Sequence, residues 1–158
     1  MEVVWPAGHE PAGAVIHERN IAECSASADA VWAWIVRPDH WRAFYPNALR
    51  VRPLEGPWPT LGMGSRFSWI TFGARVTTEV TEFEPPHRIA WTGSGLGAVG
   101  HHAWVIEPTS SGCRIVTEET QRGLAVRVLA PALRPAMRRL HQRWVEGAAR
   151  IAESGRTP

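Results

Sequence analysis

The stretch "HHAWVIEPTSSGCRIVTEETQRG", His101 to Gly123, decides the fold of this chain. Two runs rich in β-branched and aromatic residues flank "TSSG", a cluster of turn-forming residues, so the stretch predicts a β-hairpin. Reversal around this turn pairs residues that suit one buried face: Pro108 with Cys113, Ile106 with Ile115, Trp104 with Thr117, and His102 with Glu119. The residues between these face the other side of the sheet. They pair Glu107 with Arg114, two opposite charges suited to contact with solvent.

The same meander extends toward the N-terminus through turns at "GA", "EPPH" and "SGLG", with strands expected over residues 66–72, 75–83, 88–93 and 98–106. Closing these turns pairs Trp69 with Thr78, Phe67 with Val80, Val80 with Trp91, Ile89 with His102, and Trp91 with Gly100. The inner face then holds Phe67, Trp69, Val76, Val80, Ile89, Trp91, Trp104, Ile106 and Ile115. A polar row of Glu82, His102 and Glu119 crosses it, with Glu82 expected at a cavity rim.

Strands and helices are also predicted on either side of the meander. Residues 14–24 are expected to form a strand, Ser27 to cap a helix, Pro38 to open a second short helix, and Val51 to lie in a strand. The last segment has apolar residues at steps of three or four, which predicts a long helix. These residues are Leu129, Leu133, Met137, Leu140, Trp144, Ala148 and Ile151. Pro131 and Pro135 are expected to kink or interrupt its first part.

Length and composition favour a single domain of 158 residues. We expect a flexible arm at 1–14, the domain at 15–153 and a tail at 154–158. No apolar run is long enough for a transmembrane helix, and the first residues do not resemble a signal peptide, so we expect a cytoplasmic protein. Two cysteines form neither a disulfide framework nor a zinc motif.

The histidines predict no metal site. His101 and His102 are adjacent in a strand and therefore face opposite sides of the sheet. The other histidines show no ligand-like grouping, and no phosphate-binding glycine pattern or nucleophile elbow is present. We therefore expect no metal and no conventional cofactor.

His102 and Glu119 form the strongest candidate for chemistry. Ionisable groups on an inner face must pair, reach water or face a cavity, because their burial is otherwise costly. A carboxylate that accepts one ring N–H would leave the other ring nitrogen free for proton transfer. The alternative is a satisfied polar pair that orients the hairpin or a ligand.

The order of elements resembles the helix-grip fold of the START-like (SRPBCC) superfamily, which includes polyketide cyclases and lipid-transfer proteins. "ASADAVWAWI" and "EVTEFEPPHRIAWTG" are similar to the first helix and the central hairpin of its members. His102 two residues before Trp104, and a Thr-Glu-Glu run at Thr117 before Gly123, resemble the polyketide cyclase/dehydrase-like branch. The resemblance spans residues 15–153. It implies an α+β fold in which a curved, antiparallel, seven-stranded sheet wraps around a long C-terminal helix, with two short helices after the first strand.

The resemblance also implies a cavity between sheet and helix, with Trp41, Phe44 and Tyr45 at its entrance. Pairing of the first and last strands would make Cys24 and Cys113 neighbours, although we expect reduced thiols in a cytoplasm. With His102 and Glu119 as the catalytic pair, the expected ligand-binding residues are Phe67, Trp69, Val80, Glu82, Ile89, Trp91, Trp104, Thr117, Met137, Leu140, Trp144, Trp41 and Tyr45.

Three functions remain open. The first is binding of a small hydrophobic ligand, aromatic, polyketide-like or acyl, with cyclisation or dehydration by His102 and Glu119. The second is a carrier or sensor without catalysis. The third is contact with a membrane surface or nucleic acid through an arginine-rich segment, which the net charge of +2 disfavours, so no nucleic-acid partner is expected. The segment contains Arg122, Arg127, Arg134, Arg138, Arg139 and Arg143. The sequence leaves open whether the protein is a monomer or a homodimer.

Overall fold

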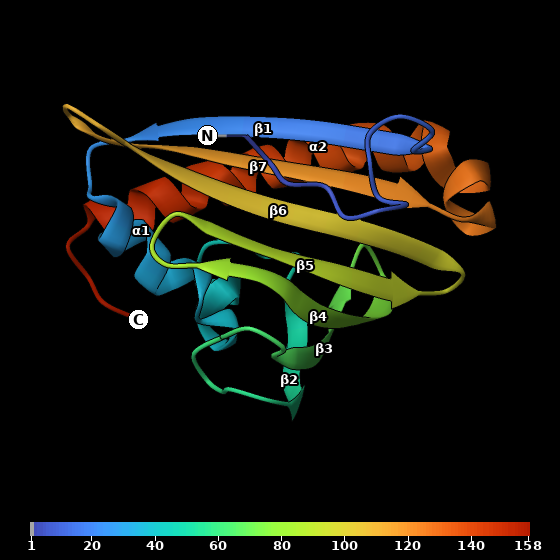
Figure 1. The fold of residues 1–158 in the computed structure, drawn as a ribbon, viewed down its shortest axis with the longest axis horizontal. Helices are drawn as coiled ribbons and strands as arrows, with labels where there is room; N and C mark the ends of the chain where they lie inside the picture. The colour runs from blue at the N-terminus through green and yellow to red at the C-terminus, as the bar shows by residue number, and fades with distance from the viewer. Residues whose placement is uncertain (1) are drawn as a thin grey trace.

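The computed structural model describes residues 2–158 and has the helix-grip architecture (Figure 1). The elements along the chain are β1 (Ile16–Cys24), α1 (Ala28–Ile35), the 3-10 helix η1 (Pro38–Ala43), β2 (Leu49–Glu55), β3 (Arg66–Thr71), β4 (Ala74–Glu84), β5 (Arg88–Gly95), β6 (Ala98–Thr109), β7 (Gly112–Arg122) and α2 (Leu124–Glu153). All strands belong to one antiparallel sheet in the order β1-β7-β6-β5-β4-β3-β2. The predicted fold class is confirmed. Ser27 caps α1 by accepting a hydrogen bond from the Ala30 amide.

The register of the β6–β7 hairpin is as predicted, including His102 opposite Glu119 and Glu107 opposite Arg114. Val80 also lies opposite Trp91, as expected. These pairs fix the inner face of the sheet, where large apolar side chains meet α2.

Two other hairpin registers were predicted wrongly, each by two residues. Trp69 pairs with Val76 rather than Thr78, and Ile89 pairs with Trp104 rather than His102. Both hairpins close through two-residue turns whose central residues have positive φ, Phe72 with Gly73 and Leu96 with Gly97. The β3–β4 turn is therefore centred one residue before the expected place, and the β5–β6 turn one residue after it. A shift of two residues leaves each side chain on its expected face.

A β-bulge removes Glu82 from the inner face. The register of β4 and β5 shifts between Val80 and Glu82, so that Glu82 lies opposite Ala90. There Glu82 Oε1 lies 2.9 Å from Arg88 Nε. Glu82 is therefore not part of the predicted polar row, which is reduced to His102 and Glu119.

Helix α2 runs without interruption through Pro131 and Pro135, contrary to one of the two outcomes expected for those prolines. It lies against one face of the sheet, on β1, β6 and β7 (Figure 1). Its C-terminal half, with Trp144, Val145 and Ala148 fully buried, packs into the main core beside α1 and η1.

The residues before β1 cross the outer face of the sheet, over β6 and β7 (Figure 1). The Arg122 side chain donates hydrogen bonds to the carbonyls of Glu10, Ala12 and Gly13. Trp5 and His9 pack against His101 with ring centroids 5.7 and 5.5 Å away. The arm therefore covers His101, which is 1% exposed.

Candidate functional site

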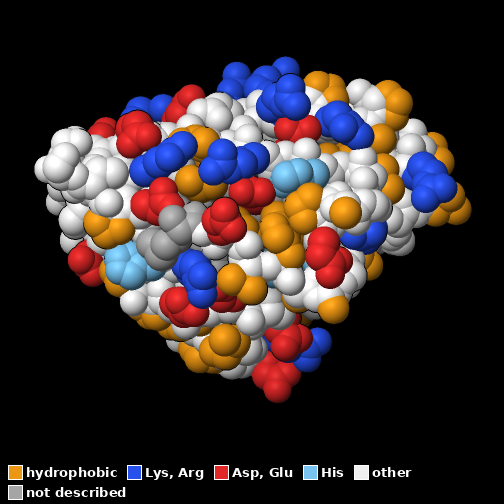
Figure 2. Space-filling view, turned by 45° about the horizontal axis from the view of Figure 1, so that its top comes forward, with side chains coloured by type: hydrophobic (Ala, Val, Ile, Leu, Met, Phe, Trp, Pro, Cys, Tyr) orange, Lys and Arg blue, Asp and Glu red, His pale blue; other side chains and the backbone are white. Residues whose placement is uncertain are grey.

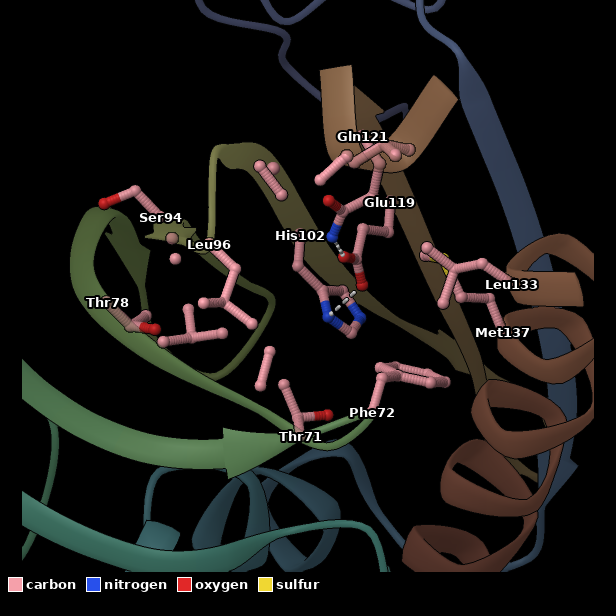
Figure 3. A pocket seen from close by; sticks show the side chains of 18 of the residues that line it. Thr71, Phe72, Thr78, Ser94, Leu96, His102, Glu119, Gln121, Leu133 and Met137 are labelled. Carbon is pink, nitrogen blue, oxygen red and sulfur yellow. Dashed lines mark hydrogen bonds and ion pairs between the residues drawn. The ribbon is translucent and has the colours of Figure 1, made fainter. Parts of the chain in front are cut away.

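A cavity of about 250 Å³ lies at one end of the molecule, between the β3–β4 and β5–β6 hairpins and the first half of α2 (Figure 3). Its walls are mostly apolar, and they include Trp69, Phe72, Val76, Trp91, Leu96, Ala98, Val126, Leu129, Leu133 and Met137. Leu96 and Leu129, 75% and 57% exposed, form part of its rim. The cavity therefore opens beside the β5–β6 turn.

A buried polar cluster forms one wall of this cavity (Figure 3). His102 Nδ1 lies 3.0 Å from Glu119 Oε2, and His141 Nε2 on α2 lies 3.4 Å from the same oxygen. The amide of Gln121 donates to Glu119 Oε1. All three of His102, Glu119 and His141 are at most 8% exposed.

The second ring nitrogen of His102 is not free, in contrast to the expectation from the sequence. His102 Nε2 lies 2.5 Å from Thr117 Oγ1. The Thr117 hydroxyl donates its proton to the Ala103 carbonyl, 2.9 Å away, so Oγ1 accepts from the Nε2–H of His102. Both ring nitrogens therefore point at protein oxygens.

Within the cluster, Glu119 is charged at neutral pH and His141 is not. Burial raises the pKa of Glu119, but His102, His141 and Gln121 together outweigh this effect and lower the pKa to about 2. Burial lowers the pKa of His141 to about 4, against a partial opposing effect of Glu119. At neutral pH the cavity wall thus presents a carboxylate beside a neutral imidazole.

Five of the predicted site residues line the cavity: His102, Glu119, Trp69, Trp91 and Met137. The others lie elsewhere, and apart from Glu82 and Leu140 they are fully buried in packed core: Phe67, Val80, Ile89, Trp104, Thr117, Trp144, Trp41 and Tyr45. Leu140 packs against the same core from α2.

The predicted entrance at Trp41, Phe44 and Tyr45 is wrong. Trp41 and Tyr45 are fully buried and Phe44 is 8% exposed. Trp41 contacts the rings of Trp69, Trp91 and Trp144 at centroid distances of 5.4, 5.3 and 5.2 Å. Because large rings fill the η1 end of the sheet–helix space, the cavity lies at the opposite end.

Sequence reasoning missed His141, Gln121 and the small residues of the β5–β6 hairpin. The inward positions Gly93, Gly95, Ala98 and Gly100 form a run of small side chains, a signal that could have located the cavity. A Cβ on Gly100 would lie 2.7 Å from Gln121 Nε2, so glycine leaves room for Gln121 to reach Glu119. No sequence pattern indicated His141, which was among the histidines without an expected partner.

The cysteines show no chemistry of their own. Cys24 lies opposite Cys113, as pairing of the first and last strands implies, but both are free and buried. Burial raises the pKa of Cys113 to about 12. Both side chains are therefore protonated thiols at neutral pH.

Two arginines of α2 bind the helix to β1 and to the residue just before it. Arg138 Nε lies 2.9 Å from the buried carboxylate of Glu18, and Arg134 donates to the Val15 carbonyl. Figure 2 shows arginine side chains, drawn in blue, gathered along the upper edge of the molecule. A surface groove formed by β1 and α2 is lined by Arg19, Arg134, Arg138, Arg139 and Arg143.

Comparison with known protein families identifies the family of this chain. Residues 19–153 match the family described as polyketide cyclase / dehydrase and lipid transport. The chain belongs to this family. Family membership and the largely apolar cavity together indicate a protein that binds a hydrophobic small molecule.

Individual relatives add support for the fold. An uncharacterised protein of Mycobacterium tuberculosis is 31% identical over 81 residues, and the chain spans about half the length of this relative. A hypothetical protein of Helicobacter pylori has a solved structure with a TM-score of 0.89, 26% identity and 96% coverage of both chains. Norcoclaurine synthase of Thalictrum flavum, solved with dopamine and hydroxybenzaldehyde, gives a TM-score of 0.66 at 14% identity with full coverage of both chains, a likeness of fold. Within residues 2–158 no helix is both long and apolar enough to cross a bilayer.

Proposed function

We propose that this protein binds and carries a small, largely apolar ligand with one polar end, in the cavity between α2 and the β3–β4 and β5–β6 hairpins. The observation that carries the proposal is the arrangement of the walls. Most of the lining side chains are apolar, with hydroxyl groups at Thr71, Thr78 and Ser94. The ionisable groups, His102, Glu119 and His141, gather on one wall. Pockets of this composition bury an apolar ligand body and use few polar groups to set its orientation.

The size of the cavity limits the ligand. A cavity of about 150 Å³ holds benzene. The space of about 250 Å³ therefore suits one or two fused rings or a short acyl chain. A ligand hydroxyl directed at Glu119 would replace a hydrogen bond to water with one to a buried carboxylate, which favours one orientation.

The first experiment is native mass spectrometry of the purified protein, followed by denaturing extraction and identification of any released molecule. A titration with a hydrophobic fluorophore, and displacement of that fluorophore by aromatic and acyl compounds, accompanies it. Ala125→Trp places a large ring at a lining position of α2, whereas Val128→Trp is a matched change at an exposed position outside the lining.

We expect a copurified or displaceable ligand in the wild type, fluorophore binding weakened at least tenfold in A125W, and wild-type binding in V128W. A protein that arrives empty and binds no fluorophore contradicts the proposal. Equal binding by A125W and wild type also contradicts it.

Catalysis of a cyclisation or dehydration is the second candidate function, because His102 and Glu119 do line the cavity. Proton transfer would proceed through the His102 Nδ1 side, which faces Glu119 and not Thr117. Once a ligand is identified, His102→Ala should abolish turnover and retain the fold. Unchanged turnover would exclude His102 as the acid–base group.

A further inference from the structure

The cluster on the cavity wall contains the donor atoms of a metal site. His102, Glu119 and His141 each offer one ligand atom, and these atoms lie within 4.8 Å of one another. Two of the separations, 3.0 and 3.4 Å, are close to the ~3.4 Å between tetrahedral ligands at ~2.1 Å from one ion. Within residues 2–158 this is the group of three such side chains that the structure brings together.

The hydrogen bonds around His102 direct its Nδ1 atom at a carboxylate. Thr117 gives its hydroxyl proton to the Ala103 carbonyl, so the Nε2–H of His102 is the donor to Thr117 Oγ1. Nδ1 then faces the Glu119 carboxylate at 3.0 Å, and a positive centre, either a ring proton or a metal ion, must lie between these two atoms. In the absence of metal the proton fills this place, and it is the proton that a metal ion would displace.

We propose that His102 Nδ1, Glu119 Oε2 and His141 Nε2 bind a divalent transition-metal ion of the zinc or iron(II) class. Two imidazoles and one carboxylate form the ligand set of catalytic zinc sites and of non-haem iron(II) sites. The binding site does not depend on the organic ligand proposed above.

The surroundings match those of a metal site with an open position. Thr117 orients His102 and Gln121 holds the second oxygen of Glu119, the outer contacts that fix ligand geometry. Trp91 and Trp144, with ring centroids 5.3 and 5.2 Å from that of His102, exclude water on the core side. The three ligands line the cavity, so a fourth coordination position faces it.

The test uses the full chain, stripped with a chelator, dialysed and kept free of organic ligand. Isothermal titration with Zn²⁺ measures stoichiometry and affinity, and Co²⁺ spectra report the ligand types. Glu119→Gln and His141→Gln remove ligands, Thr117→Val removes an outer contact, and His101→Gln is the matched buried histidine on the opposite face. Circular dichroism checks that each variant is folded.

We expect one equivalent of Zn²⁺ bound by wild type and H101Q, at least a hundredfold weaker binding in E119Q and H141Q, and a 10- to 100-fold loss in T117V. The Co²⁺ spectrum should show d–d bands without thiolate charge transfer. Absence of saturable Zn²⁺ binding by the wild type would overturn the proposal. So would wild-type affinity in folded E119Q and H141Q, or thiolate bands that place the ion at Cys24 and Cys113.

Discussion

Tyr45 and Trp144 stack face to face, with ring centroids 4.0 Å apart and planes at 1° to each other. Tyr45 follows η1 and Trp144 lies in the C-terminal half of α2, so the stack joins the two elements that close this end of the sheet. It is one reason that the cavity lies near the first half of α2.

Truncation of Trp144 should open a void in this closed end. Trp144→Ala is expected to lower the free energy of unfolding by roughly 3–5 kcal/mol, because the ring is fully buried and the surrounding rings cannot collapse into the space. Urea unfolding followed by circular dichroism measures the change. Val128→Ala, at an exposed position of the same helix, should stay within about 0.5 kcal/mol. A similarly small effect of W144A would show that the stack is not part of the stabilising core.

Gly147 is required for the approach of α2 to η1. Alanine normally stabilises a helix interior by about 1 kcal/mol over glycine. A Cβ at Gly147, however, would lie 2.4 Å from the Phe44 carbonyl oxygen. Gly147→Ala should therefore lower the free energy of unfolding by about 1 kcal/mol or more in urea titrations. A gain in stability would mean that the two elements separate without cost.

His101 should make the protein sensitive to acid. Burial, with smaller contributions from the neighbouring His9 and His102, lowers its pKa from 6.5 to about 4. Between pH 6.5 and 4 the unfolded chain therefore binds more protons at this residue than the folded chain, and the free energy of unfolding decreases as pH falls through this window. The whole change in pKa corresponds to about 3 kcal/mol, so the free energy of unfolding is expected to fall by roughly 1–3 kcal/mol over this pH window.

Thermal or urea unfolding at a series of pH values between 4 and 7 measures this dependence. His101→Gln should give a shallower slope than the wild type over the same range. Parallel slopes would assign the acid sensitivity to other groups, of which His141 is the first to examine.

Arg122 should control the N-terminal arm. Its guanidinium donates to three carbonyls of residues 10–13. Removal of these bonds leaves the arm held by the rings of Trp5 and His9 and by the hydrogen bond from the Thr120 hydroxyl to the His9 carbonyl. Arg122→Ala is expected to speed amide hydrogen exchange over residues 8–14 about tenfold, for a loss of about 1.4 kcal/mol of local stability. Exchange in α2 should be unchanged. Wild-type exchange in the arm would show that the ring contacts and the Thr120 hydrogen bond are sufficient to hold it.

Much of the fold could be predicted, because it follows from local patterns. The β6–β7 pairs were correct since one two-residue turn and the alternation of apolar residues determine them. The predicted β3–β4 and β5–β6 registers were wrong because Phe72 and Leu96 adopt positive φ, a conformation that neither residue type favours. The bulge in β4 gave no sequence signal, and it moved Glu82 out of the site.

The candidate site could be predicted only in part. His102 and Glu119 are cross-strand neighbours in one hairpin, so their meeting follows from register. His141 reaches them from α2, and no local pattern specifies which turn of a helix faces which strand. The sequence alone thus determined the element order, the inner face and the His102–Glu119 pair, because these depend on short-range periodicity. Tertiary structure alone decided where the cavity lies and added His141 to the pair, because both depend on how bulky rings of distant segments fill the space between sheet and helix.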